Sequence, residues 1–277
     1  MVNTSVAGRF RLDGKVIIIT GGAGLLGRKH AEAVAEMGAI PVIWDVDEKA
    51  AKDAADGIRH AFKGKALGMG CDITDERSIL KAFARVLKTF KKVEVLINNA
   101  ANNYKVEGGK KQFSRLENFP REAWDQDIAV GLTGAFLCSR VIGAHMAQHG
   151  GGVILNIASD LGIIAPDQRI YREEGKAEEE QPVKPVTYSA VKAGLLGLSK
   201  YLATYWADKG VRVNAVSFGG VSNNQDEAFV KKLTNLIPLG RMADKDEYKA
   251  VVVFLVSDAS SYMTGSNLVI DGGRTTW

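Results

Sequence analysis

Tyr188 and Lys192 stand four residues apart in the segment TYSAVKAG, which lies in a stretch with a helical apolar pattern. Residues at this spacing share one helix face, so we expect the Lys192 ammonium beside the Tyr188 phenol. A neighbouring positive charge favours the phenolate and lowers the pKa of a tyrosine from about 10. We therefore predict that Tyr188 is a general acid and base for an alcohol or carbonyl oxygen.

Ser159 ends the strand pattern GVILNIAS. Open α/β sheets bind their ligands at the carboxyl ends of the strands, so the Ser159 hydroxyl is expected to hold the substrate oxygen beside Tyr188. A tyrosine and a lysine four residues apart are frequent on helix surfaces, and this pair alone would be weak evidence. Together, Ser159, Tyr188 and Lys192 form the predicted catalytic group.

A glycine loop, ITGGAGLLG, follows the apolar run that begins at Val16. Gly21 and Gly24 would permit a tight turn and the close approach of a pyrophosphate, and Gly27 would let the next helix pack against the strand. The exposed amides at a helix start also bind anions. The loop predicts a dinucleotide site, although a simple connecting turn is the alternative.

Asp45 ends the next strand pattern, about 18 residues beyond Gly27. A carboxylate at this place accepts hydrogen bonds from the ribose hydroxyls of NAD and repels the 2′-phosphate of NADP. The alternative is that Asp45 caps a helix, a role that Asp47 fits equally well. We predict NAD as the cofactor, with NADP less favoured.

The elements that position these residues are short β-branched runs alternating with helical stretches, which indicates βαβ units. The fold class is therefore α/β, a Rossmann-type doubly wound sheet of seven parallel strands with helices on both faces. We expect residues 1–277 to form a single domain with a long inserted loop at about 163–186. The predicted strands are 16–20, 41–44, 66–70, 93–97, 153–157, 211–216 and 268–270.

Composition excludes several classes of protein. The formal charge of +4 is spread along the chain without a basic arm, so nucleic acid is not an expected partner. No stretch approaches the roughly 18 apolar residues that span a bilayer, and residues 1–13 lack the apolar core of a signal peptide. We expect a cytoplasmic protein without a membrane partner. The two cysteines suggest no disulfide framework, and no acidic or cysteine cluster completes a metal site with His145 and His149.

These motifs, in this order, resemble the short-chain dehydrogenase/reductase family over essentially the whole chain. The resemblance also covers CDITDE, NNAA, VRVNAVS and the closing DGG. It implies reversible NAD(P)-dependent oxidation of an alcohol, with Ser159 orienting the substrate, Tyr188 as acid and base, and Lys192 binding the nicotinamide ribose. It also implies a homodimer or homotetramer. The implied cofactor-binding residues are Gly21, Gly24, Leu25, Leu26, Asp45, Asp72, Ile73, Asn99, Ala100, Tyr188, Lys192, Gly219 and Val221.

Four residues depart from the family pattern. Leu25 replaces a loop glycine, which gives a spacing more typical of the family's extended branch of sugar-nucleotide enzymes. Gly131 replaces an asparagine that holds a kink and a proton-relaying water near the lysine. We expect the kink to persist, because glycine tolerates unusual dihedrals, and proton exchange to be slower. Ala101 replaces a glycine, and Phe218 replaces a proline near the nicotinamide.

The segment between Ser159 and Tyr188 holds 28 residues, more than is usual in the family. The segment would supply donors for a phosphate or carboxylate of a small alcohol or carbonyl substrate, and these are Arg169, Tyr171, Arg172, Lys176 and Lys184. A solvated loop or a subunit contact is the alternative. The flanking sequence is similar to oxidoreductases of bacterial surface-sugar or flagellin modification pathways, which suggests a phosphorylated or nucleotide-linked sugar.

Two other functions remain open. A catalytically weak, NAD-binding regulator would account for the changes at Leu25, Gly131 and Phe218. The glycine spacing also allows a sugar-nucleotide epimerase or dehydratase that recycles its cofactor. Net NADH production separates the dehydrogenase from both alternatives.

Overall fold

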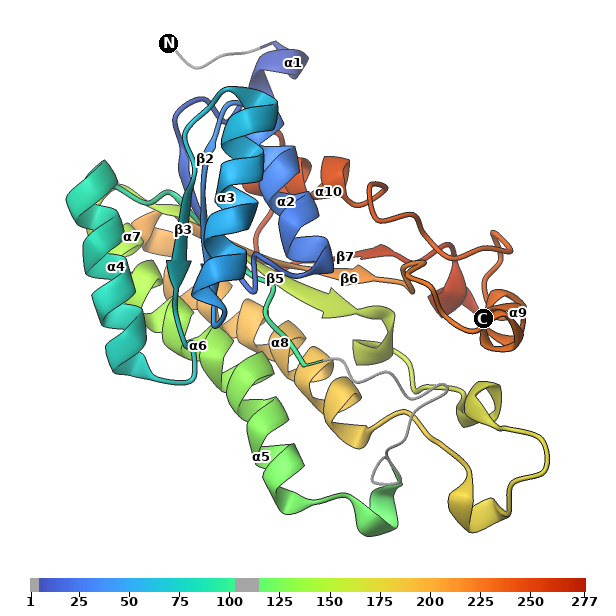
Figure 1. Cartoon of the computed structure of the whole chain (residues 1–277). Helices are drawn as coiled ribbons and strands as arrows, with labels where there is room; N and C mark the ends of the chain where they lie inside the picture. Colours follow the sequence, from blue (N-terminus) through green and yellow to red (C-terminus); the bar gives the residue numbers. More distant parts are fainter. Residues whose placement is uncertain (1–4, 103–114) are drawn as a thin grey trace.

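The computed structural model describes residues 5–102 and 115–277, and all seven predicted strands form one parallel sheet (Figure 1). Along the sheet the strand order is β3-β2-β1-β4-β5-β6-β7. The chain builds outward from β1 to β3 and returns to β4 beside β1, so the order reverses between β1 and β4. This arrangement confirms the predicted doubly wound sheet. The strands are β1 Val16–Thr20, β2 Ile40–Asp45, β3 Leu67–Gly70, β4 Val95–Asn98, β5 Gly152–Ser159, β6 Val211–Phe218 and β7 Asn267–Ile270.

The strand β1 is buried on both faces. Its side chains alternate, so that Ile17 and Ile19 join one hydrophobic cluster while Val16 and Ile18 join another. All four are fully buried. A parallel sheet covered by helices on both sides requires such a continuous apolar strand, which is why the run VIII precedes the glycine loop.

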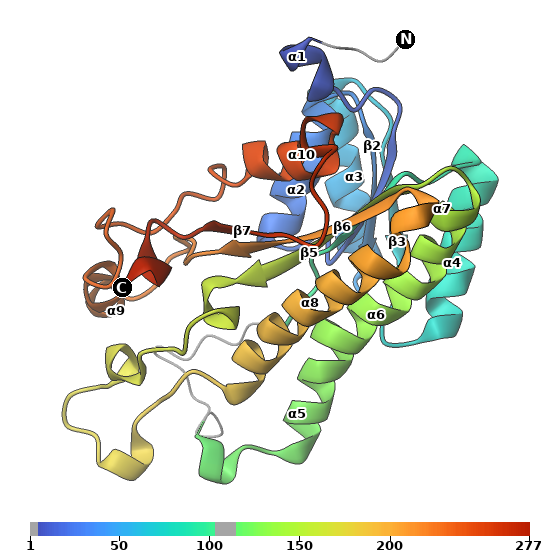
Figure 2. The same ribbon diagram turned by 180° about the vertical axis from the view of Figure 1, so that it is seen from behind.

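Helices cover both faces of the sheet. On one face lie α2, α3 and α10, and on the other lie α4, the segment from α5 to α7, and α8 (Figures 1 and 2). Asp47 and Asp75 cap the starts of α3 and α4 through their side chains. The helices are α1 Val6–Arg9, α2 Leu25–Glu36, α3 Glu48–Phe62, α4 Glu76–Phe90, α5 Arg121–Ile128, α6 Gly134–Cys138, α7 Ala144–Gln148, α8 Val186–Tyr205, α9 Glu227–Thr234 and α10 Lys249–Val256.

Two π-helical turns, Ala129–Thr133 and Ser139–Gly143, join α5, α6 and α7. Each turn holds a glycine against which α8 or its C-terminal end packs closely. A Cβ at Gly131 would lie 2.4 Å from Val191 Cγ1, and one at Gly143 would lie 2.5 Å from the Trp206 ring. The expected distortion at Gly131 is therefore present as a π-helical turn.

The segment 121–148 is long and apolar enough, by length and composition, to cross a membrane. This corrects the expectation that the chain contains no such stretch. Cys138, Ile142 and Met146 are fully buried in the hydrophobic cluster beneath the sheet. Packing in the protein core therefore accounts for these three residues, whereas Phe136 of the same segment is 41% exposed.

The long segment between β5 and α8 folds into three short 3-10 turns, Asp160–Gly162, Gln168–Tyr171 and Glu178–Glu180. Ile170 and Tyr171 are buried in a third hydrophobic cluster, which also contains Leu233 of α9. The Tyr171 ring lies 5.4 Å from the Phe229 ring between centroids. The insertion is thus anchored to α9 by an apolar contact of its own.

Candidate active site

In the glycine loop, the backbone at Gly21 and Gly27 lies against neighbouring backbone and leaves no room for a side chain. Gly21 adopts a φ of +58°, and a Cβ there would lie 2.9 Å from the Ala100 Cα. At Gly27, an added Cβ would lie 2.2 Å from the Gly21 carbonyl oxygen. A turn at Gly21 and tight packing of α2 at Gly27 are what the sequence predicts for these two positions.

Asp45 lies at the carboxyl end of β2 and turns back toward the loop. Its Oδ2 accepts a hydrogen bond from the Ala23 amide at 3.1 Å, and its Oδ1 accepts one from the Asp47 amide at 3.2 Å. Asp47, and not Asp45, caps α3, since its side chain accepts a bond from the Ala50 amide. The capping alternative for Asp45 is therefore excluded.

Ser159, Tyr188 and Lys192 come together at the carboxyl end of β5. Ser159 is the last residue of that strand, and α8 carries the other two on one face. The Lys192 Nζ donates a hydrogen bond to the Ile157 carbonyl at 2.7 Å and lies 5.8 Å from the Tyr188 ring centroid. Helix α8 thus places Tyr188 and Lys192 beside the carboxyl end of β5.

Burial sets the protonation of this group. The pKa of Lys192 falls from 10.5 to about 8, chiefly because the side chain is buried and also because of the nearby charge of Lys184. Burial also raises the pKa of Tyr188, which a hydrogen bond with Ser159 opposes and the charge of Asp160 reinforces. This direction is opposite to the one predicted from the helical spacing, because the desolvation of a buried phenol outweighs the attraction of a lysine that bonds elsewhere.

A single cavity of about 820 Å³ joins the glycine loop to Ser159. Every residue that the sequence indicates for the cofactor lines it, from Gly21 to Val221. Its volume falls within the range of small-molecule and cofactor sites. Its wall also contains polar residues to which the sequence analysis gives no role, among them Asp160, Asn223, Gln225 and Arg274.

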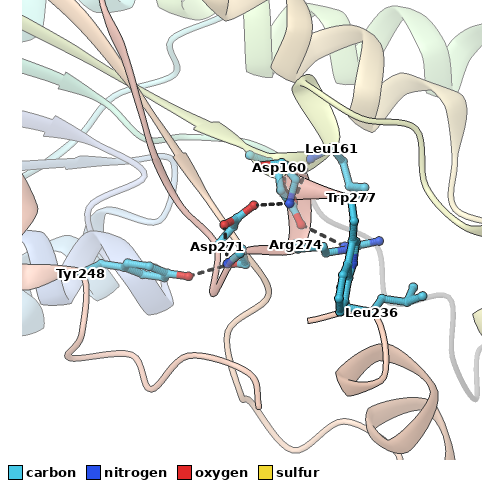
Figure 3. A network of polar contacts seen from close by, with 11 residues as sticks. Asp160, Leu161, Leu236, Tyr248, Asp271, Arg274 and Trp277 are labelled. Atoms are coloured by element: carbon cyan, nitrogen blue, oxygen red, sulfur yellow. Dashed lines mark hydrogen bonds and ion pairs between the residues drawn. The ribbon is translucent and has the colours of Figure 1, made fainter. Parts of the chain in front are cut away.

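Asp160 and Arg274 form a buried ion pair in the cavity wall (Figure 3). Asp160 Oδ1 accepts hydrogen bonds from Ser159 Oγ at 2.7 Å and from the Leu161 amide at 2.8 Å, while its Oδ2 accepts one from Arg274 Nη1 at 2.9 Å. Arg274 comes from the last 3-10 turn, and Asp271 stabilises that turn by accepting from the Thr275 amide. The C-terminal end of the chain therefore contacts the group around Ser159.

The inserted segment contributes unevenly to the cavity. Tyr171 lines it, whereas Arg169 and Arg172 do not. The two guanidinium groups form exposed ion pairs, Arg169 with Asp167 and Arg172 with Glu178. Neither arginine therefore lies where the sequence analysis expected a substrate-binding donor.

Lys184 is the cation that the insertion does bring to the cavity. Its Nζ lies 4.1 Å from the Tyr188 ring centroid, and its charge lowers the pKa of Lys192. A positive charge over an aromatic face is attracted by the ring. Of the four basic residues that the sequence indicates as donors in the insertion, Lys184 is the one that lines the cavity.

The residues present fit a dinucleotide. Gly21, Gly24, Leu25 and Leu26 line the cavity at the start of α2, where backbone amides can bind an anion. Asp45 also lines the cavity, at the end of β2, which β1 and β4 separate from the strand that carries Ser159. This is a position suited to a ribose-binding carboxylate. Phe218 stacks on Tyr248 with 3.9 Å between centroids, and it occupies the position at which the family has a proline.

Comparison with known proteins gives the same picture over nearly the whole chain. The family model described as enoyl-(acyl carrier protein) reductase matches residues 22–275. The chain is 35% identical to D-threitol dehydrogenase of Mycolicibacterium smegmatis over 96% of its length and 95% of that protein, and 34% identical to an NAD-dependent glycerol dehydrogenase of Listeria innocua over 96% of both. A short-chain type dehydrogenase/reductase from Mycobacterium marinum superimposes with a TM-score of 0.84 at 30% identity, covering 98% of this chain and 99% of that one.

These names refine the expectations from sequence. Both curated relatives are named for polyols, so the resemblance to surface-sugar or flagellin modification enzymes is not supported. Relatives at about one-third identity include NAD-dependent and NADP-dependent enzymes. The chain belongs to the short-chain dehydrogenase/reductase family and is an NAD(P)-dependent oxidoreductase that acts on CH–OH groups.

Proposed function

We propose that this protein is an NAD-preferring dehydrogenase of small polyols, with Ser159, Tyr188 and Lys192 as its catalytic residues. The observation that carries the proposal is the meeting of these three side chains in the cavity that also contains the glycine loop. A regulator without turnover would not need a buried lysine at this place, since burying an ammonium is costly.

Each residue has a distinct task. Tyr188 takes the proton of the alcohol oxygen during oxidation and returns it during reduction. Ser159 holds the same oxygen, and Asp160 fixes the orientation of its hydroxyl through the 2.7 Å hydrogen bond. Lys192 places a positive charge beneath the site and would hold the ribose next to the nicotinamide. When bound along the glycine loop, NAD supplies the chemistry of hydride acceptance.

Asp45 supports NAD over NADP. Its carboxylate is held in place by two backbone amides at the cavity edge. A 2′-phosphate at this position would meet a fixed negative charge, whereas two ribose hydroxyls would find acceptors.

The polar wall near Ser159 supports a small polyol as the substrate. Asp160, Asn223, Gln225 and Arg274 can donate to or accept from adjacent hydroxyl groups. The two arginines expected to hold a phosphate lie outside the cavity, which weighs against a phosphorylated sugar. The names of the threitol and glycerol relatives agree with this choice.

Turnover tests the proposal directly. NADH formation would be followed with threitol, glycerol and mannitol, with a sugar phosphate and a nucleotide sugar as contrasts. Tyr188→Phe is expected to lower turnover at least about 100-fold. Tyr262→Phe, at a fully exposed tyrosine before β7, is the matched control and should keep full activity. Full turnover in Tyr188→Phe would refute the assignment, and conversion of the nucleotide sugar without net NADH would favour an epimerase.

Calorimetric titration tests the cofactor preference. Wild-type protein is expected to bind NADH more tightly than NADPH. Asp45→Ala should narrow the difference between these two affinities, because it removes the repulsion between the carboxylate and the 2′-phosphate. Asp47→Ala serves as the control, because that carboxylate caps α3 and should affect stability instead. Equal binding of both cofactors by wild-type protein would contradict the role given to Asp45.

A second copy of this chain is the proposed partner, as in the sequence analysis. Tyr201 and Tyr205 of α8 are 63% and 61% exposed and stack at 5.8 Å between centroids. Exposed aromatic groups of this kind are frequent in protein interfaces. Light scattering after gel filtration should give a dimer or tetramer, and a monomeric mass would contradict it.

A further inference from the structure

A second, much smaller cavity lies beside the predicted catalytic residues. Its volume is about 10 Å³, which is the space that one water molecule needs. Tyr188 and Lys192 line it together with Asp127, Thr187 and Asn102. A water in this cavity would therefore meet both the predicted proton-exchanging group and a carboxylate.

Asp127 is an unusual group to find there. It is 6% exposed and lies near the end of α5. Its Oδ2 accepts a hydrogen bond from Thr187 Oγ1 at 2.5 Å, and its Oδ1 accepts one from Asn102 Nδ2 at 3.0 Å. Both of these partners are neutral. Burying a carboxylate is costly, so a position beside the catalytic residues calls for a reason beyond packing.

Gly131 explains why the cavity keeps this form. It lines the cavity in the π-helical turn after α5, and a Cβ at this position would lie 2.4 Å from Val191 Cγ1. An asparagine, which the family usually has here, does not fit unless Val191 moves. The space is therefore bounded by backbone at Gly131, and the polar side chains that face it come from Asp127, Thr187 and Asn102.

We propose that Asp127 accepts the proton that Tyr188 and Lys192 release, through one water in this cavity, and so replaces the missing asparagine. The proposal rests on the roles proposed for Tyr188 and Lys192. During oxidation the alcohol O–H bond breaks and the Tyr188 oxygen takes that proton as it gives up its own phenol proton. When bound, NAD would accept the hydride from the same carbon. The site then passes one proton to the water, the water passes one to the Asp127 carboxylate, and Asp127 releases it to solvent. Reduction runs the same path in reverse.

The cavity wall accounts for the direction of the path. Among its lining residues the titratable groups are Asp127, Tyr188 and Lys192. Lys184 does not line it, and its Nζ lies 4.1 Å from the Tyr188 ring centroid. The lysine donates to the Ile157 carbonyl, which fixes its position but cannot carry a proton away. Asp127 is the one carboxylate among the residues that line this cavity. It is thus the group there that can hold a proton between the site and solvent.

Stopped-flow measurement of NADH and of released protons tests the relay in the intact enzyme. In wild type, a pH-indicator dye should report proton release together with the first NADH burst. Asp127→Asn keeps the shape of the side chain and removes its capacity to accept a proton. We expect the NADH burst to remain, proton release to lag, kcat to fall about tenfold and the solvent deuterium isotope effect on kcat to rise. Asp125→Asn, an exposed residue of the same helix, should behave like wild type.

A purely structural role for Asp127 would lower the unfolding temperature without separating NADH formation from proton release. Synchronous release in Asp127→Asn, with a normal isotope effect, would overturn the relay. Tyr188→Phe separates the two proposals, since it should abolish the burst itself. A burst retained in Tyr188→Phe would refute the proposed function, whereas a lost burst there with wild-type behaviour in Asp127→Asn would refute the relay alone.

Thr187 provides a second test that does not depend on the folding of the Asp127 variant. Thr187→Val removes the hydroxyl that donates to the Asp127 carboxylate and holds its position. Proton release should lag behind the NADH burst in Thr187→Val and stay synchronous with it in Thr187→Ser, which keeps the hydroxyl. Synchronous release in both variants would contradict the proposal.

Discussion

At the scale of single residues, the site carries a cost in stability. Lys192 is buried, and its pKa falls from 10.5 to about 8. The unfolded chain therefore binds this proton more tightly than the folded one, and the free energy of unfolding rises with pH between about 8 and 10.5. Below pH 8 both states are protonated, and the folded protein bears the full cost of the buried ammonium.

Replacing this lysine should therefore stabilise the fold. Each unit of difference between the folded and unfolded pKa of Lys192 corresponds to about 1.4 kcal/mol. Burying the ammonium therefore costs about 3 kcal/mol of folding free energy at pH 7. Lys192→Met also loses the hydrogen bond to Ile157, worth about 1 kcal/mol. We expect a net gain of about 2 kcal/mol and a rise of about 5 °C in the unfolding midpoint, with loss of turnover. Calorimetry at pH 7 checks this, and a lower midpoint would contradict it.

His30 of α2 makes the free energy of unfolding depend on pH in the acidic range. Burial lowers its pKa from 6.5 to about 4, and the neighbouring Asn99 offsets this only in part. The unfolded chain then binds a proton that the folded one does not, so the free energy of unfolding falls as the pH drops from about 6.5 to 4.

The His30→Leu variant should lose this dependence. Urea unfolding at pH 7, 6 and 5 should show a fall of about 1.4 kcal/mol per pH unit at the steepest part in wild type and a flatter curve in the variant. His60→Gln is the control, because that side chain is exposed on α3 and should leave the slope unchanged. Equal slopes in wild type and His30→Leu would show that other groups set the acid dependence.

At the scale of elements, two helical glycines have opposite consequences. A Cβ at Gly27 would lie 2.2 Å from the Gly21 carbonyl oxygen, whereas a Cβ at Gly57 of α3 meets nothing within 4 Å. Gly27→Ala should push α2 away from the loop, lower the free energy of unfolding by about 2 kcal/mol and weaken NADH binding. Gly57→Ala should raise stability by up to about 1 kcal/mol, because alanine favours the helix.

Denaturant unfolding and calorimetric NADH titration of both variants test this difference. If Gly27→Ala bound NADH as tightly as wild type, the close packing at Gly27 would not be needed for cofactor binding. A loss of stability in Gly57→Ala would mean that helix propensity does not control that position.

At the scale of the whole molecule, the C-terminal residues contact the active site. Arg274 is 7% exposed and pairs with Asp160 from the end of β5, more than a hundred residues earlier. Trp277 holds the end in place by donating a hydrogen bond from its Nε1 to the Leu236 carbonyl. The last residues therefore influence chemistry at the centre of the sheet.

Removing the arginine should leave a buried, unpaired carboxylate. Arg274→Met is expected to lower the free energy of unfolding by about 3–5 kcal/mol. It should also move the pH profile of oxidation to higher pH, because the charge of Asp160 already raises the pKa of Tyr188 and would then be less compensated. Arg274→Lys keeps a positive charge and should shift the profile less. An unchanged profile in Arg274→Met would separate the ion pair from the chemistry.

The sequence by itself determined the sheet, the glycine loop and the position of Ser159, Tyr188 and Lys192. These depend on local rules, since strand and helix periodicity, glycine conformation and a four-residue helical spacing are readable within a few residues.

Only the tertiary structure decided the rest. It placed Lys184 over the tyrosine and excluded Arg169 and Arg172 from the cavity. It also brought Asp127 to the cavity beside Lys192 and Arg274 to Asp160. Such contacts join residues far apart in the chain, and burial reversed the predicted direction of the Tyr188 pKa, because desolvation depends on everything that surrounds a group.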